Sequence, residues 1–161
     1  MLYSWRRSPD MAGIRSLPRA EQPDVYTEVT FGPYAAADFG GANTYVRLPF
    51  LPMRDAVITA VCVKCNTKPS VACSFSLAKV AGGVAPPTGA VSAANRVSEA
   101  VDANGKTNDT LFELPIHPTT GRKDSLNNNV VEAGGSLFIH STAAATSMAG
   151  AFFSIRFRTK K

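Results

Sequence analysis

Apolar and polar residues alternate with a period of two as soon as the chain passes its first two dozen residues. In residues 25–31 every second side chain, from Val25 to Phe31, falls on one face, and the alternation stops at Gly32-Pro33. A period of two is that of a half-buried β-strand, because successive side chains of a strand point to opposite faces. The first element that we predict is therefore a strand.

Two later segments carry the same signal and lie close together in the sequence. Residues 57–65 are a long β-branched run, and in residues 70–80 every second side chain from Val71 to Leu77 is predicted to face inward. The small residues that alternate with these inward-facing side chains are predicted to face solvent. A turn at residues 66–69 then predicts that the two segments pair as an antiparallel hairpin.

Further short strands complete the pattern, and no helical repeat is long enough to compete with them. The predicted strands are residues 44–48, 91–97, 111–114, 136–141 and 151–158. A short helix in residues 92–101 is the only helical candidate. Many short strands separated by Gly, Pro and Asn turns are typical of an antiparallel β-sandwich, and we predict an all-β domain with a jelly-roll topology.

The first 24 residues have a different composition. They contain three prolines and four arginines and no sustained apolar period. Such a composition cannot bury a core of its own and predicts an extended N-terminal arm. We therefore divide the chain into an arm at 1–24, a β-sandwich domain at 25–158 and a basic tail at 159–161.

Composition and charge favour a protein that binds other proteins. Charged residues make up 18 % of the chain, below the ~25 % of an average protein, so much of the surface is suited to cover by partners. The net charge of +5 comes from the ends: residues 1–23 hold four arginines against two acids, and residues 152–161 hold four basic residues and no acid. The remaining residues hold nine basic against ten acidic side chains, so a basic nucleic-acid-binding face is not predicted.

The cysteines do not predict a metal or redox site. Cys62 and Cys65 form a C-V-K-C pair, but a structural zinc needs four ligands, and His117 and His140 lack any close spacing to them. Residues three apart in a strand also face opposite sides. With Cys73, we predict three free thiols, as in a protein made in a reducing cytoplasm. The chain shows no secretory signal and no apolar run long enough to span a membrane.

Other candidate motifs also fall short of a catalytic or cofactor site. Gly105-Lys106-Thr107 resembles the end of a phosphate-binding loop, but the first glycine of that motif is replaced by Ala100. Residues 102–108 lack the glycine that a calcium loop requires. We therefore predict that the protein has no cofactor and is not an enzyme.

The C-terminal half resembles small jelly-roll structural proteins of tailed bacteriophages. The resemblance rests on VVEAGGSLFIHSTAAATSMAGAFFSIRF (residues 130–157), where an apolar pair and a glycine turn precede a strand, a small-residue hairpin and a final alternating strand. The segment 56–77 is similar to an earlier hairpin of that group. The likeness covers residues 42–158 and concerns the fold, without a diagnostic motif.

The resemblance implies a virion structural role. In that group such domains serve as capsid decoration (cement) proteins, head fibres, or tail and fibre modules. The expected function is a decoration protein that binds and bridges major capsid subunits, forms homo-oligomers and is located on the virion, with no membrane partner. Trp and Arg are enriched at interface hot spots, so we predict that the arm binds partners through Trp5, Arg6, Arg7, Arg15 and Arg19.

Two other functions remain open at this point. A carbohydrate-binding or receptor-binding module of a tail fibre would need exposed aromatic residues on one sandwich face, and Tyr34, Phe39 and Tyr45 are the candidates. A head–tail connector or tail component would also use an extended arm.

Overall fold

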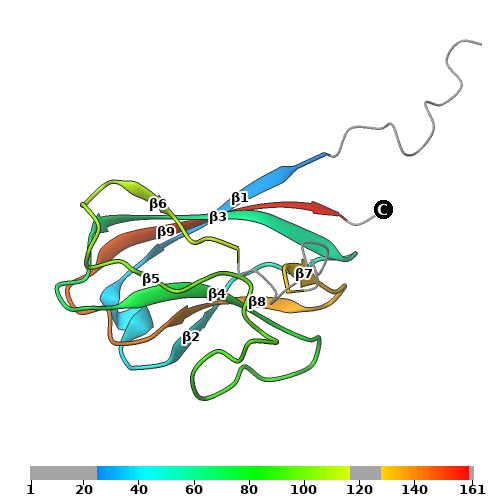
Figure 1. The fold of residues 1–161 in the computed structure, drawn as a ribbon, viewed down its shortest axis with the longest axis horizontal. Helices are drawn as coiled ribbons and strands as arrows, with labels where there is room; N and C mark the ends of the chain where they lie inside the picture. Colours follow the sequence, from blue (N-terminus) through cyan, green and yellow to red (C-terminus); the bar gives the residue numbers. More distant parts are fainter. Residues whose placement is uncertain (1–24, 117–127, 160–161) are drawn as a thin grey trace, which may run out of the picture.

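The computed structural model describes residues 25–116 and 128–159, which form two antiparallel β-sheets packed face to face (Figure 1). The all-β prediction is confirmed. The elements are β1 (Thr27–Tyr34), the 3₁₀ helix η2 (Ala36–Phe39), β2 (Thr44–Arg47), β3 (Ala56–Thr67), β4 (Ser74–Val80), β5 (Val101–Asp102), β6 (Leu111–Glu113), β7 (Val130–Val131), β8 (Ser136–Ser141) and β9 (Ala149–Thr159).

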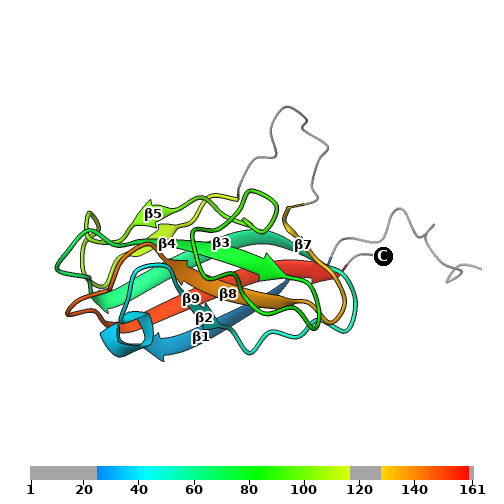
Figure 2. The same ribbon diagram turned by 90° about the horizontal axis from the view of Figure 1, so that it is seen from below.

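The strand order links segments that are far apart in the sequence. One sheet has the order β1-β9-β3-β6, with β7 also pairing with β3, and the other has the order β2-β8-β4-β5. Figure 2 shows β4 and β8 lying over β3 and β9. Apart from the two-residue β7, the pairs are nested: β1 pairs with β9, β2 with β8, β3 with β6 and β4 with β5.

The predicted hairpin between residues 57–65 and 70–80 is wrong. β3 and β4 lie in opposite sheets, and β3 instead pairs along most of its length with β9, where Val61 faces Ile155 and Val63 faces Phe153. The chain crosses between the sheets after β3, and the crossing is held where the Ser70 amide donates to the Thr146 carbonyl at 2.9 Å. Alternation predicts which face of a strand is buried, but it does not identify the neighbouring strand.

The segment after β4 forms neither the predicted strand at 91–97 nor the predicted helix at 92–101. It makes only isolated bridges, between Ala78 and Arg96 and between Ser98 and Ile116. Residues 95–98 of this segment lie beside β4, where the Val97 amide donates to the Leu77 carbonyl at 2.9 Å and the Leu77 amide donates to Ser98 Oγ at 2.7 Å. Ser76, which was predicted to face solvent, is buried with only 2 % of its surface exposed, and its Oγ lies 3.5 Å from His140 Nδ1.

Two apolar residues at the ends of the alternating runs are exposed instead of buried. Val25 precedes β1 and Val71 precedes β4, so neither is part of a strand. The runs predict burial only as far as the opposite sheet extends over them. Within the strands Phe31 and Phe75 are buried as predicted, whereas Thr27, at the start of β1, is exposed. The predicted strand 136–141 coincides with β8.

Four aromatic rings fill the centre of the core between the sheets. The Phe39 ring centroid lies 5.1 Å from that of Phe75, and Phe75 and Phe153 are 5.6 Å apart. Tyr34 packs on Phe153 at 5.8 Å. Phe39 comes from η2, whose first turn is closed when the Ala35 amide donates to Asp38 Oδ2. The short helix therefore delivers a fully buried ring into the core from a segment that has no strand pattern.

Candidate functional site

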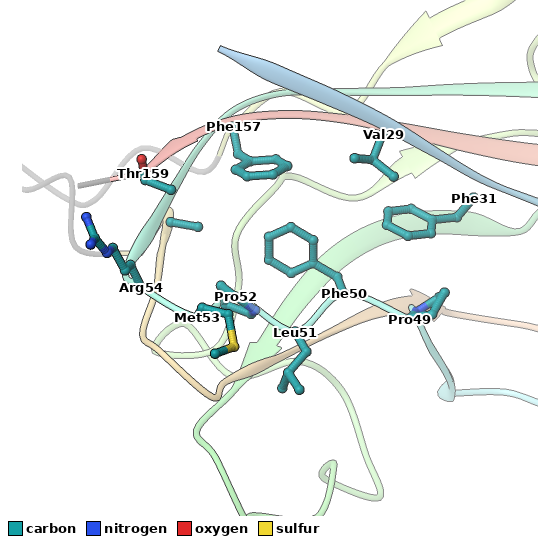
Figure 3. Close-up of a pocket in the computed structure, with 11 residues that line it drawn as sticks. Val29, Phe31, Pro49, Phe50, Leu51, Pro52, Met53, Arg54, Phe157 and Thr159 are labelled. Atoms are coloured by element: carbon teal, nitrogen blue, oxygen red, sulfur yellow. The ribbon is translucent and has the colours of Figure 1, made fainter. Parts of the chain in front are cut away.

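An apolar groove opens between the edge strand β1 and the connection that leads from β2 to β3 (Figure 3). It has a volume of about 410 Å³ and lies at the end of the sandwich where β1 begins and β9 ends, since Thr27 pairs with Phe157. Its lining residues are Val29, Phe31, Pro49, Phe50, Leu51, Pro52, Met53, Arg54, Ala56, Phe157 and Thr159.

The connection between β2 and β3 forms one wall of the groove. It is apolar, but it cannot pair as a strand. Residues 48–53 read Leu-Pro-Phe-Leu-Pro-Met, and the two prolines lack the amide hydrogens that a strand ladder needs. Its backbone is fastened to the body where the Gly134 amide donates to the Pro52 carbonyl at 2.9 Å. The Phe50 ring turns inward and packs edge-on against Phe157 at 5.0 Å, as Figure 3 shows.

Exposed hydrophobic side chains gather at the rim of this groove. The exposed fractions are 62 % for Leu51 and 89 % for Met53. Scattered exposed apolar residues are normal, but a group around an apolar hollow is typical of an interaction site.

The groove continues along β1 toward its other end. A second hollow of about 320 Å³ shares Phe31 and Pro49 with the first and reaches Tyr34. In the described part of the chain β1 pairs with β9 alone, so its other edge carries backbone groups without a strand partner. The apolar groove therefore follows an open strand edge.

The charge of the groove is positive. Among the described residues that line either hollow, Arg54 is the only charged one. No ion pair joins it to a carboxylate of the described residues, whereas Arg156, on the outer face, lies 3.5 Å from Glu28. Thr159, at the end of β9, also lines the groove and is uncharged.

No family model, curated protein or solved structure matches this chain. The site is therefore interpreted from its own geometry. In residues 25–116 and 128–159 no three His, Cys, Asp or Glu side chains are grouped to hold a metal ion, and no helix there is long and apolar enough to cross a membrane.

The arm residues predicted to bind partners, Trp5, Arg6, Arg7, Arg15 and Arg19, lie outside the described residues. Their role stays a prediction, as does the basic tail.

The aromatic residues proposed for glycan binding do not form one exposed face. Phe39 is fully buried and Tyr34 packs against it at 6.2 Å, inside the core. Tyr45 lies on β2 in the other sheet, where its hydroxyl donates to the Gly89 carbonyl at 2.7 Å. These three residues therefore do not form the exposed aromatic face that a carbohydrate-binding module would need.

The turn at residues 102–109 has a structural role. Asp102 Oδ1 accepts hydrogen bonds from the amides of Cys73 and Asn104, both at 3.1 Å. The turn connects β5 in one sheet to β6 in the other. Because the Asp102 carboxylate accepts hydrogen bonds from two backbone amides, it stabilises this crossing between the sheets.

The three cysteines are free thiols: Cys62 and Cys65 are part of β3, and Cys73 directly precedes β4. Cys62 faces outward and is partly exposed, whereas Cys65 and Cys73 are buried in the core. Burial raises the pKa of Cys65 to about 11, with the neighbouring Cys73 adding to the effect. Burial also raises the pKa of Cys73, whose Sγ donates to the Ala143 carbonyl at 3.2 Å.

We expect iodoacetamide to alkylate the native protein at Cys62 first. Only the thiolate reacts. The pKa of Cys62 is also raised, by partial burial and then by Glu113 and Glu28, so the exposure of Cys62 is what distinguishes it from the two buried core thiols. Mass spectrometry of the native protein at pH 7.5 should show one modification well before the others, and denatured protein should show three. In Cys62→Ser the early modification should vanish. Equal rates at all three thiols in the native state would contradict the burial of Cys65 and Cys73.

His140 is buried between β2 and β4 with only 3 % of its surface exposed. Its Nε2 lies 3.2 Å from Asn43 Oδ1 and its Nδ1 3.5 Å from Ser76 Oγ. The Tyr45 ring packs on it at 4.8 Å. Burial, and then the charge of Arg96, lower the pKa of His140 below its ordinary value of 6.5.

We expect the protein to lose stability as the pH falls below 6.5. The unfolded chain binds the proton at the ordinary pKa, while the folded state resists it, so the free energy of unfolding should fall by at most about 1.4 kcal/mol per pH unit from this group. Guanidinium titrations between pH 7 and pH 5 measure this slope. It should flatten in His140→Gln, and His117→Gln, which removes the other histidine, should keep it. A slope unchanged in His140→Gln would assign the effect to other groups.

Proposed function

We propose that this protein is a virion structural protein, a capsid decoration protein that binds shell subunits and neighbouring copies of itself. The observation that carries the proposal is the apolar groove along the open edge of β1, with Leu51 and Met53 exposed at its rim. Exposed apolar side chains around a hollow favour a protein partner over solvent. The location on a virion rests on the resemblance described above.

The strand order supports the jelly-roll topology on which this resemblance depends. The first strand pairs with the last, the second with the next to last, and the nesting continues to the adjacent strands β4 and β5. A strand ribbon folded back on itself and wound into two sheets gives this order. Jelly rolls of this kind are frequent in viral shells and lectins.

Counting the chain in purified particles tests the proposed function. Particles isolated on a density gradient from cells that carry the gene should contain it in many copies, by quantitative mass spectrometry. Leu51→Ser/Met53→Ser should reduce its incorporation, whereas the matched pair Val71→Ser/Leu111→Ser, which changes exposed apolar residues elsewhere, should not. Absence of the chain from particles would contradict the proposal.

Removal of residues 1–23 should leave a folded body with weakened attachment. The described sandwich begins with β1 at Thr27, so the truncation removes none of its strands. The arm holds Trp5 and four arginines, and Trp5→Ala alone should cost about 2 kcal/mol of binding if Trp5 is a hot spot. Circular dichroism measures the fold and particle binding measures the attachment. Binding equal to that of the full chain would show that the body alone attaches.

A further inference from the structure

We propose that the groove along β1 binds an extended segment of a partner protein, which adds as a strand to β1 and carries alternating apolar residues and at least one carboxylate. The inference rests on the proposed function only in taking the partner to be a shell protein. It names the chemistry by which that partner is recognised.

The open edge of β1 supplies the backbone of such a site. The strand pairs with β9 in regular register from Thr27 to Phe31, and the register shifts between Phe31 and Tyr34. Pro33 in this shifted part has no amide hydrogen to offer. A partner strand would therefore pair with the five residues from Thr27 to Phe31, where alternate backbone groups point away from β9.

The floor of the groove supplies pockets for alternate side chains. Val29 and Phe31 lie two residues apart on the inner face of β1, and Figure 3 shows both turned toward Phe50. Alternate side chains of an added strand are spaced by about 6.5 Å and point to the same face. Two apolar side chains of the partner, two residues apart, would therefore enter the groove beside Val29 and Phe31.

The positive charge at the groove favours a partner segment that carries a carboxylate. Arg54 lines the groove at the end where β9 stops, and neither hollow is lined by a described carboxylate. The chain's own residues 1–23 carry a net +2 and would bring like charge to this end. A partner segment with a carboxylate is complementary in charge, whereas the arm of a second copy is not.

Selection of peptides against the full chain tests this chemistry directly. From a displayed library of random ten-residue peptides, we expect binders enriched in alternating apolar residues and in Asp or Glu. A selected peptide should bind at least about tenfold more weakly to Leu51→Ser/Met53→Ser and to Arg54→Glu, by fluorescence anisotropy. Replacing its acidic residues by Lys should restore binding to Arg54→Glu. Val71→Ser/Leu111→Ser is the matched control, and circular dichroism establishes that each variant is folded.

Strand addition has a backbone signature that mere apolar contact lacks. N-methylation of alternate residues along one edge of the selected peptide should abolish binding, and the same number of methyl groups along the other edge should not. A pool of binders without acidic enrichment, the recovery of no binder that is sensitive to Arg54→Glu, or equal effects of the two methylation patterns would each overturn the proposal.

Sedimentation velocity separates this partner from a second copy of the chain. We expect the full chain and Leu51→Ser/Met53→Ser to have the same oligomeric state. If the groove variant dissociates an oligomer, or if a synthetic peptide of residues 1–23 displaces the selected peptide, the occupant is a second copy and the proposal is wrong. Peptide binding without incorporation into particles would contradict only the virion role, and incorporation without peptide binding would contradict only the groove.

Discussion

Replacement of Phe153 by alanine is expected to lower the free energy of unfolding by about 4 kcal/mol, a cost typical of deleting a buried phenylalanine ring. Phe153 is fully buried in β9, between β1 and β3, and its ring packs against Phe75 at 5.6 Å and Tyr34 at 5.8 Å. The alanine leaves a cavity that neither sheet can close without moving the other aromatic rings. Equilibrium unfolding in guanidinium chloride measures the loss.

The neighbouring ring provides the control. Phe152 lies on the opposite, outer face of β9 and is only partly buried, so Phe152→Ala should cost about 1 kcal/mol. Both substitutions remove the same atoms from the same strand, one residue apart. Equal losses in the two variants would mean that the cost reflects β9 itself, and the aromatic centre of the core would then contribute little.

Replacement of Gly32 by alanine is expected to cost about 3 kcal/mol, through backbone strain and a close contact. Gly32 has φ +132°, a conformation that alanine rarely adopts, and a Cβ built there would lie 2.5 Å from the Ala151 carbonyl oxygen. The substituted strand would have to move away from β9. Because β1 forms one wall of the groove, the selected peptide should also lose affinity.

Gly89→Ala is the matched control for this substitution. A Cβ at Gly89 meets no heavy atom within 4 Å, and the φ of Gly89 lies outside the positive range. The free energy of unfolding of Gly89→Ala should therefore stay within about 0.5 kcal/mol of wild type. A Gly32→Ala variant as stable as Gly89→Ala would show that β1 shifts from β9 without cost.

The sequence predicted elements better than their pairing, for a physical reason. Alternation reports which side chains of a strand are buried, so residues 136–141 matched β8 and Phe75 and Leu77 were correctly placed inside. The partner of a strand depends on contacts distant in the chain. The β-branched run of β3 could have paired with its sequence neighbour, but it pairs with β9, about ninety residues later (Val63 with Phe153).

The groove was missed because its wall is not a regular element. Residues 48–53 are as apolar as a strand, yet the prolines remove them from any ladder, so they carry no strand or helix signal. That combination is the signal that could have found it: apolar residues held outside secondary structure must cover a core edge or a partner. Phe50 covers a core edge, and Leu51 and Met53 remain exposed.

The position of β9 also determines when the protein can fold during its synthesis. β9 lies between β1 and β3, so β1, the first of the described strands to be synthesised, has its hydrogen-bonding partner in residues 149–159. Until that segment emerges, the inner edges of β1 and β3 are both unpaired, and unpaired strand edges are prone to aggregation. Between the synthesis of β3 and that of β9, a nascent chain therefore exposes two strand edges that pair with β9 only after residues 149–159 have been made.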